Sequence, residues 1–114
     1  MPNRRIARIN TLLQQEIDRY ITRSFEPPQG VLITIEEVIA SNDLSHAKVL
    51  VSVFPPSSAH VVLKDLQEQA KEIRYLLKKR LTLKMMPHIH FIADNREERA
   101  AHIYRILDDS GKTE

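Results

Sequence analysis

The stretch LKDLQEQAKEIRYLLKKRLTLKMMP, Leu63–Pro87, sorts into three faces when it is placed on a helix at about 100° per residue. One face is apolar and consists of Leu63, Leu66, Ala70, Ile73 and Leu77. A second face is basic and consists of Lys64, Lys71, Arg74 and Lys78, while three carboxylates occupy the third. Such a helix packs its apolar face on a core and presents a row of cations to solvent. We therefore predict a helix over residues 59–80 with a cationic exposed side.

The residues before this helix predict another helix and two strands. Apolar residues recur at steps of three and four over residues 4–23, and the predicted buried stripe is Ile6, Ile9, Leu13, Ile17, Tyr20 and Ile21. β-Branched residues then alternate over 31–40, and the doublet Glu36-Glu37 shifts the apolar phase, which indicates a β-bulge or the end of the strand. A second alternating stretch, 47–54, follows Ser41-Asn42-Asp43, so we expect a β-hairpin.

The residues after the basic helix predict a third strand over 88–93 and a last helix over 96–107. The apolar stripe of that helix consists of Ala100, Ile103, Tyr104 and Leu107. A strand–helix–strand connection makes the second and third strands parallel if they share a sheet. The predicted order is therefore α-β-β-α-β-α, an α+β fold with helices packed on a small sheet.

Composition excludes several classes of site. The chain has 114 residues and no cysteine, so it has neither disulfides nor thiolate metal ligands. Its only glycines are Gly30 and Gly111, which rules out the glycine-rich phosphate loops and the nucleophile elbow. His88 and His90 share a strand face, but no further ligand is signalled nearby, so we assign no metal site. We expect no catalytic residue and no cofactor, and therefore no enzyme.

Positive charge is concentrated in two segments, although the net charge is only +2. Residues 1–23 hold five arginines and two acids, and residues 64–84 hold seven basic residues and three acids. Local potential attracts polyanions more than total charge does. Two basic helices therefore favour contacts with the phosphates of RNA, with little base specificity.

Four stretches of the sequence resemble the ribosome-binding factor A family. They are RRIARI (4–9), SNDLSHAKV (41–49), IRYLLKK (73–79) and LKMMPHIHFIAD (83–94). Each is short, but their order and spacing agree with the family over residues 4–108.

This resemblance implies a type II KH-like domain, α-β-β-α-α-β with an additional C-terminal helix and a three-stranded mixed sheet. We expect a single RNA-binding domain over residues 1–108 and a disordered polar tail over 109–114. In the family, a kink carrying Ala-x-Gly lies between two helices. The matching residues here are Ala70-Lys71-Glu72, so the glycine is missing and the sequence leaves open whether the helix bends.

The resemblance also implies a function. It implies a non-enzymatic cytoplasmic factor that binds the small (30S) ribosomal subunit and assists late maturation of its ribosomal RNA, including the 5′ end. The expected partners are that subunit and its RNA, with no membrane and no DNA, and the free chain is expected to be a monomer. Two alternatives stay open: a KH-like module for another structured RNA, and a protein-interaction domain with an acidic partner.

We predict the RNA contacts from the basic segments. The predicted RNA-binding residues are Arg4, Arg5, Arg8, Lys71, Arg74, Lys78, Lys79, Arg80 and Lys84. Asp43 is expected to stabilise the hairpin turn rather than to contact RNA.

Overall fold

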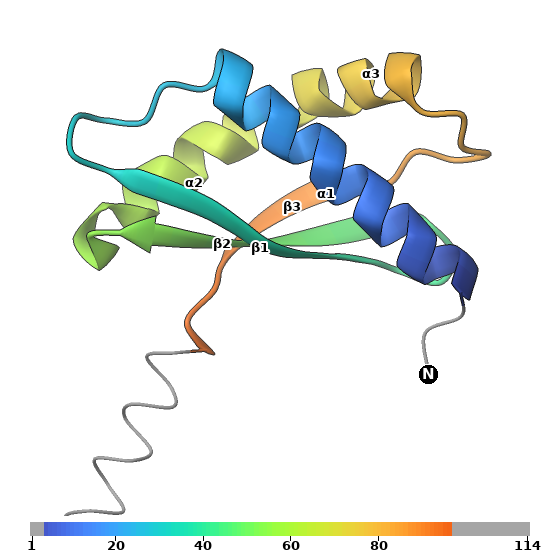
Figure 1. The fold of residues 1–114 in the computed structure, drawn as a ribbon, viewed down its shortest axis with the longest axis horizontal. Coiled ribbons are helices and arrows are strands. Elements are labelled where there is room, and N and C mark those ends of the chain that lie inside the picture. The colour runs from blue at the N-terminus through green and yellow to red at the C-terminus, as the bar shows by residue number, and fades with distance from the viewer. Residues whose placement is uncertain (1–3, 97–114) are drawn as a thin grey trace, which may run out of the picture.

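The computed structural model describes residues 4–96 (Figure 1). The elements in chain order are α1 (Arg4–Ser24), β1 (Leu32–Ala40), β2 (His46–Phe54), the 3₁₀ turn η1 (Pro56–Ser58), α2 (Ala59–Glu68), α3 (Ala70–Arg80) and β3 (His88–Ala93). The predicted helix over 96–107 and the predicted tail over 109–114 lie outside the described residues, apart from residue 96. Within the described part, no helix is both long enough and apolar enough to cross a membrane.

The three strands form one mixed sheet in the order β1-β2-β3. β1 pairs antiparallel with β2, and the register shifts between Ile35 and Glu37, so the predicted hairpin and bulge are both confirmed. β2 pairs parallel with β3, because α2 and α3 carry the chain back across the sheet. The architecture is therefore α+β, and the order α-β-β-α-α-β agrees with the type II KH-like fold.

All three α-helices lie on the same face of the sheet (Figure 1). The predicted stripe of α1 is buried against this face, except for the half-buried Ile21. Leu66 of α2 and Ile73 of α3 are fully buried and meet the inward side chains of β2 and β3. One apolar core therefore fills the space between helices and sheet.

Polar side chains fix the helices on the strands. The Asn10 side-chain oxygen of α1 accepts a hydrogen bond from the Ala40 amide of β1 at 2.8 Å. The Gln67 side chain of α2 donates to the Ile89 carbonyl at 3.0 Å and accepts from the Phe91 amide at 2.9 Å. Gln67 thereby satisfies backbone groups on the outer edge of β3, which would otherwise be open to pairing with another strand.

The helix predicted over 59–80 is divided into α2 and α3, because the chain bends at Gln69, a point that the sequence had left open. The Gln69 backbone has φ −92° and ψ 1°, and its amide donates to the Leu66 carbonyl at 3.0 Å instead of continuing the α-helical ladder. A residue of any type can adopt this negative φ, so the bend requires no glycine. The Tyr20 hydroxyl of α1 supports the bend by donating to the Gln69 side-chain oxygen at 2.8 Å.

Candidate nucleic-acid interface

The first turn of α1 lies beside the loop that joins α3 to β3. Arg4, Arg5 and Arg8 line one shallow hollow together with Lys84 of that loop. All four side chains belong to exposed residues, so their charged groups face solvent. The fold therefore brings cations from the start of the chain next to a lysine that follows them by some eighty residues in sequence.

Lys84 also lines a second hollow, on the side of α3. Arg74 and Lys78 of α3 contribute to this hollow, and Leu83 is shared by both. The two hollows therefore form one continuous cationic surface with Lys84 at its centre. We call this the basic surface, and it consists of Arg4, Arg5, Arg8, Arg74, Lys78 and Lys84.

Arg74 has a structural role in addition to its charge. Its Nε and Nη2 atoms donate to the Met86 carbonyl at 3.1 and 2.9 Å, which fixes the loop before β3. Met86 and Pro87 are buried beside it. The Arg74 charge lowers the pKa of His88, with burial and neighbouring cations adding to the effect. Sequence periodicity placed Arg74 on the basic face of the helix but did not predict its hydrogen bonds to Met86.

Lys71 and Lys79 lie on the exposed side of α3. Lys71 continues the row of Arg74 and Lys78, since these residues are three and four positions apart along the helix. The Lys79 ammonium lies 4.5 Å from the centre of the Tyr75 ring. Tyr75 is 58% exposed, so the structure places an aromatic ring on which a base could stack among the cations of α3. In the sequence, the position of Tyr75 outside the apolar stripe of the helix could have indicated that its ring is exposed.

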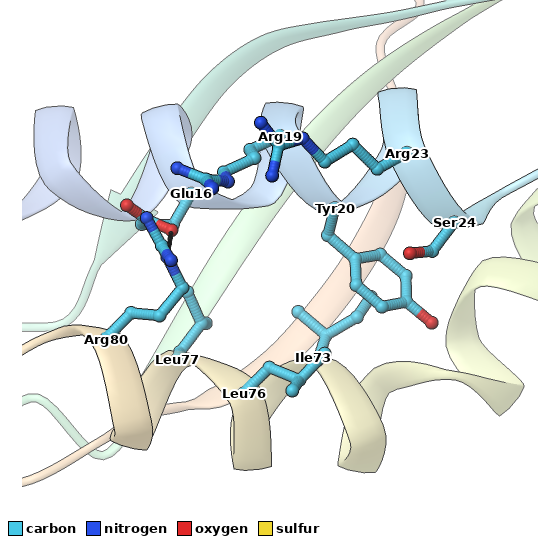
Figure 2. A pocket seen from close by; sticks show the side chains of 9 residues that line it. All are labelled: Glu16, Arg19, Tyr20, Arg23, Ser24, Ile73, Leu76, Leu77 and Arg80. Carbon is cyan, nitrogen blue, oxygen red and sulfur yellow. Dashed lines mark hydrogen bonds and ion pairs between the residues drawn. The ribbon is translucent and has the colours of Figure 1, made fainter.

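Arg80 does not line the basic surface, and its side chain forms an ion pair. Its Nε donates to a carboxylate oxygen of Glu16 on α1 (Figure 2). The pair lies at the edge of a hollow between α1 and α3, whose floor is apolar. Arg19 and Arg23 of α1 line the same hollow and are exposed, although neither was among the predicted contacts. In the sequence, their four-residue spacing on the polar side of α1 could have identified them as further candidate contacts.

The hairpin loop borders the basic surface. Asp43 and Asn42 line a hollow with Arg5 and Lys84. One oxygen of the Asp43 carboxylate accepts hydrogen bonds from the Ser41 hydroxyl at 2.7 Å and from the Ser45 amide and hydroxyl at 3.0 and 2.7 Å. These donors lower the pKa of Asp43 to about 2, the Ser45 hydroxyl having the largest effect. The hydrogen bonds agree with the structural role predicted for Asp43.

The side chains of the basic surface present positive charge to solvent. Lysine and arginine side chains on an open surface can follow a phosphate backbone, because their charged groups move over several ångströms at low cost. His46 Nδ1 and His90 Nε2 lie 2.9 Å apart on the other face of the sheet. Among residues 4–96, however, no group of three or more His, Asp or Glu side chains is arranged to hold a metal ion.

Known proteins resemble this chain in sequence and in fold. A family model described as "Ribosome-binding factor A" matches residues 5–107. A protein of that name from Thermodesulfovibrio yellowstonii is 30% identical over 112 residues, which cover 98% of this chain and 95% of that protein.

Two solved structures show the same fold. The crystal structure of ribosome-binding factor A from Thermus thermophilus gives a TM-score of 0.67 at 23% identity, with 77% of this chain and 94% of that one covered. A model of the Thermus thermophilus factor, fitted into a cryo-EM map of a 30S–RbfA complex, gives a TM-score of 0.58 at 24% identity and covers 82% and 96%.

Proposed function

Because the chain belongs to the ribosome-binding factor A family, we propose that it binds the small ribosomal subunit and assists late maturation of that subunit's RNA, including the 5′ end. The relative fitted into the 30S–RbfA map supports this proposal. In this proposal the chain acts in the cytoplasm as a monomer, and it acts by binding, without catalysis.

The basic surface is the proposed site of RNA contact. The observation that carries this assignment is the position of Lys84, which joins the arginines of α1 to Arg74 and Lys78 of α3. A phosphate backbone that crosses this surface meets six cations from three separate segments, a number that gives strong and salt-dependent binding. Contacts with phosphates do not distinguish one base from another, so specificity comes from the shape of the folded RNA.

The other predicted contacts extend this surface unequally. Lys71 and Lys79 lengthen it along α3, with Tyr75 between them as a surface for an unpaired base. Arg80 is expected to contribute less, because a phosphate must compete with Glu16 for its guanidinium. Arg19 and Arg23 are added to the proposed contacts on the α1 side.

The experiment that tests this function is co-sedimentation of the full chain with small subunits. We expect the chain to bind immature particles more tightly than mature ones, and unrelated structured RNA to compete poorly with either. Equal competition by unrelated RNA would instead support a general KH-like RNA-binding module. Complexes that survive complete digestion of the RNA would support a protein partner, and both results contradict the proposal.

A further inference from the structure

Two hollows follow each other along one face of α1. The residues of α1 that line them recur at steps of three and four and therefore share a face: Ile9, Leu12, Glu16, Arg19 and Arg23. The first two line a hollow of the basic surface, and the other three line the hollow between α1 and α3 that Figure 2 shows. An RNA strand that crosses the basic surface and continues along α1 therefore passes over this second hollow.

The second hollow, which we call the α1–α3 hollow, has an apolar floor. Ile73 and Leu77 are buried beneath it, and the half-buried Leu76 lies at its surface. The Tyr20 ring reaches from α1 toward Ile73 and forms a wall (Figure 2). The Tyr20 hydroxyl already donates to Gln69 at 2.8 Å, so this residue contributes its ring to the hollow. These side chains offer contact area to an apolar or aromatic group.

The rim of the α1–α3 hollow is positively charged. Arg19 and Arg23 are exposed, and within residues 4–96 neither forms an ion pair with a carboxylate. Glu16 also lies on the rim, but its pair with Arg80 offsets its charge. Ser24 adds a hydroxyl group at the end away from this pair (Figure 2). The charge of the rim therefore favours an anionic occupant.

The spacing of the two free arginines suits a nucleic-acid strand. Arg19 and Arg23 are four residues apart on one helix, which is a rise of about 6 Å. This rise is close to the separation of neighbouring phosphates in a single strand. A guanidinium group also binds phosphate oxygens with two parallel hydrogen bonds. One nucleotide can therefore lie over the hollow with a phosphate near each arginine.

The size of the hollow selects one kind of base. Its volume is about 130 Å³. An apolar cavity of about 150 Å³ accepts benzene, so the hollow accommodates one six-membered ring, whereas the two fused rings of a purine exceed it. The polar edge of a pyrimidine then lies at the mouth of the hollow, within the reach of the arginine donors.

We propose that the α1–α3 hollow holds one unpaired pyrimidine of the bound RNA, while Arg19 and Arg23 hold the phosphates on either side of it. Unpaired RNA bases are bound in this way against aromatic and apolar side chains. This inference rests on the proposed RNA binding and adds a base preference that the basic surface does not supply.

Three short RNA probes of equal length and charge test the proposal in the full chain. One carries a single central uracil, one a single central adenine and one no base, and all their other riboses lack a base. We expect the uracil probe to move the ¹³C-methyl NMR signals of Leu76 and Leu77, because the ring current of a bound base acts on nearby methyl groups. The base-free probe should move the amide signal of Lys84 but not these methyl signals. Equal methyl shifts with uracil and adenine, or with all three probes, contradict the proposal.

Variants separate the floor of the hollow from its rim. The natural chain should bind the uracil probe at least about fivefold more tightly than the base-free probe. Leu76→Gln keeps the charge and should remove this advantage, whereas the matched control Val61→Gln, at a position 53% exposed on α2, should keep it. An advantage that Leu76→Gln retains in full overturns the proposal.

The arginines should affect all three probes alike. Arg19→Gln combined with Arg23→Gln removes two phosphate contacts, so it should weaken the three probes by the same factor and leave the advantage of uracil in place. A double variant that binds every probe like the natural chain overturns the role given to the rim.

Two further comparisons identify the occupant and the source of any failure. A short acidic peptide with one leucine is added in place of RNA. If it moves the Leu76 methyl signals more than the uracil probe does, the hollow binds an acidic protein segment, which overturns the proposal. A chain that co-sediments with small subunits but shows no uracil shift loses this inference and keeps the proposed function. A chain that shows the uracil shift without co-sedimentation keeps the base site and loses the proposed function.

Discussion

Asp43 shows how one side chain determines the shape of the hairpin loop. Its carboxylate receives the hydroxyl groups of Ser41 and Ser45 and the Ser45 amide, so the loop closes around one acceptor oxygen. Leu44 adopts the left-handed backbone conformation with φ 59°, which is unfavourable for a residue of this type. The Leu44 side chain is buried, and this burial offsets the backbone strain.

Replacement of Asp43 by asparagine should make stability less dependent on pH in the acid range. The folded-state pKa of about 2 lies below the ordinary aspartate pKa of 3.8, so the carboxylate stabilises the fold above pH 4 and loses this contribution as the pH falls toward 2. We expect Asp43→Asn to be less stable than the natural chain at pH 7 and to approach it near pH 2. Urea unfolding at a series of pH values measures this difference.

The serines provide the control for Asp43. Ser41→Ala combined with Ser45→Ala removes the hydroxyl donors and should flatten the same part of the pH profile. A natural chain whose advantage over Asp43→Asn is constant from pH 7 to pH 2 would contradict this account of the loop.

At the level of elements, the bend between α2 and α3 determines where the basic side of α3 points. α2 packs on β2 and β3, whereas α3 contacts β3 and also α1. Tyr20 of α1 holds the bend, since its hydroxyl donates to Gln69 at 2.8 Å and to Glu72 at 3.3 Å. Burial raises the pKa of Tyr20, and Glu72 raises it further. The phenol therefore stays protonated and remains a donor at neutral pH.

Tyr20→Phe should destabilise the fold while leaving the aromatic packing of α1 intact. Loss of these hydrogen bonds is expected to cost about 0.5–1.5 kcal/mol of unfolding free energy at pH 7. The cost should shrink above pH 10, because the raised pKa of Tyr20 contributes stability only while the phenol is protonated in the folded state. Denaturant unfolding at pH 7 and above pH 10 measures both effects.

Thr22→Ala serves as the control for Tyr20→Phe, since Thr22 is an exposed residue of the same helix. If the two variants are equally stable at pH 7, Tyr20 does not support the bend.

Periodicity predicted the elements well but not their bends and partners. The apolar stripe of α1 and the hairpin follow from spacing alone, because burial on one face leaves a regular pattern. The bend at Gln69 follows from no such pattern, since its backbone conformation is open to every residue type. The bonds of Arg74 to Met86 and of Arg80 to Glu16 join distant parts of the chain, so only the folded structure reveals them.

For the whole molecule, the fold converts two basic segments into one surface. We predicted nine RNA-binding cations from the sequence, and the structure gathers six of them, Lys84 and five others, into one surface. It also separates the cations by role. Lys78 and Lys84 are exposed and carry charge alone, whereas Arg74 also anchors the loop before β3. Lys78 and Lys84 are therefore the residues whose replacement isolates binding from folding.

The most direct test of the basic surface is the salt dependence of binding to small subunits for the variant Lys78→Ala, Lys84→Ala. The control is Lys48→Ala, which removes an exposed lysine from the opposite face of the sheet. We predict that each lost phosphate contact flattens the slope of log K against log salt by roughly 0.7–0.9, while the control keeps the natural slope. An unchanged slope and affinity in the double variant would contradict the assignment of this surface to RNA.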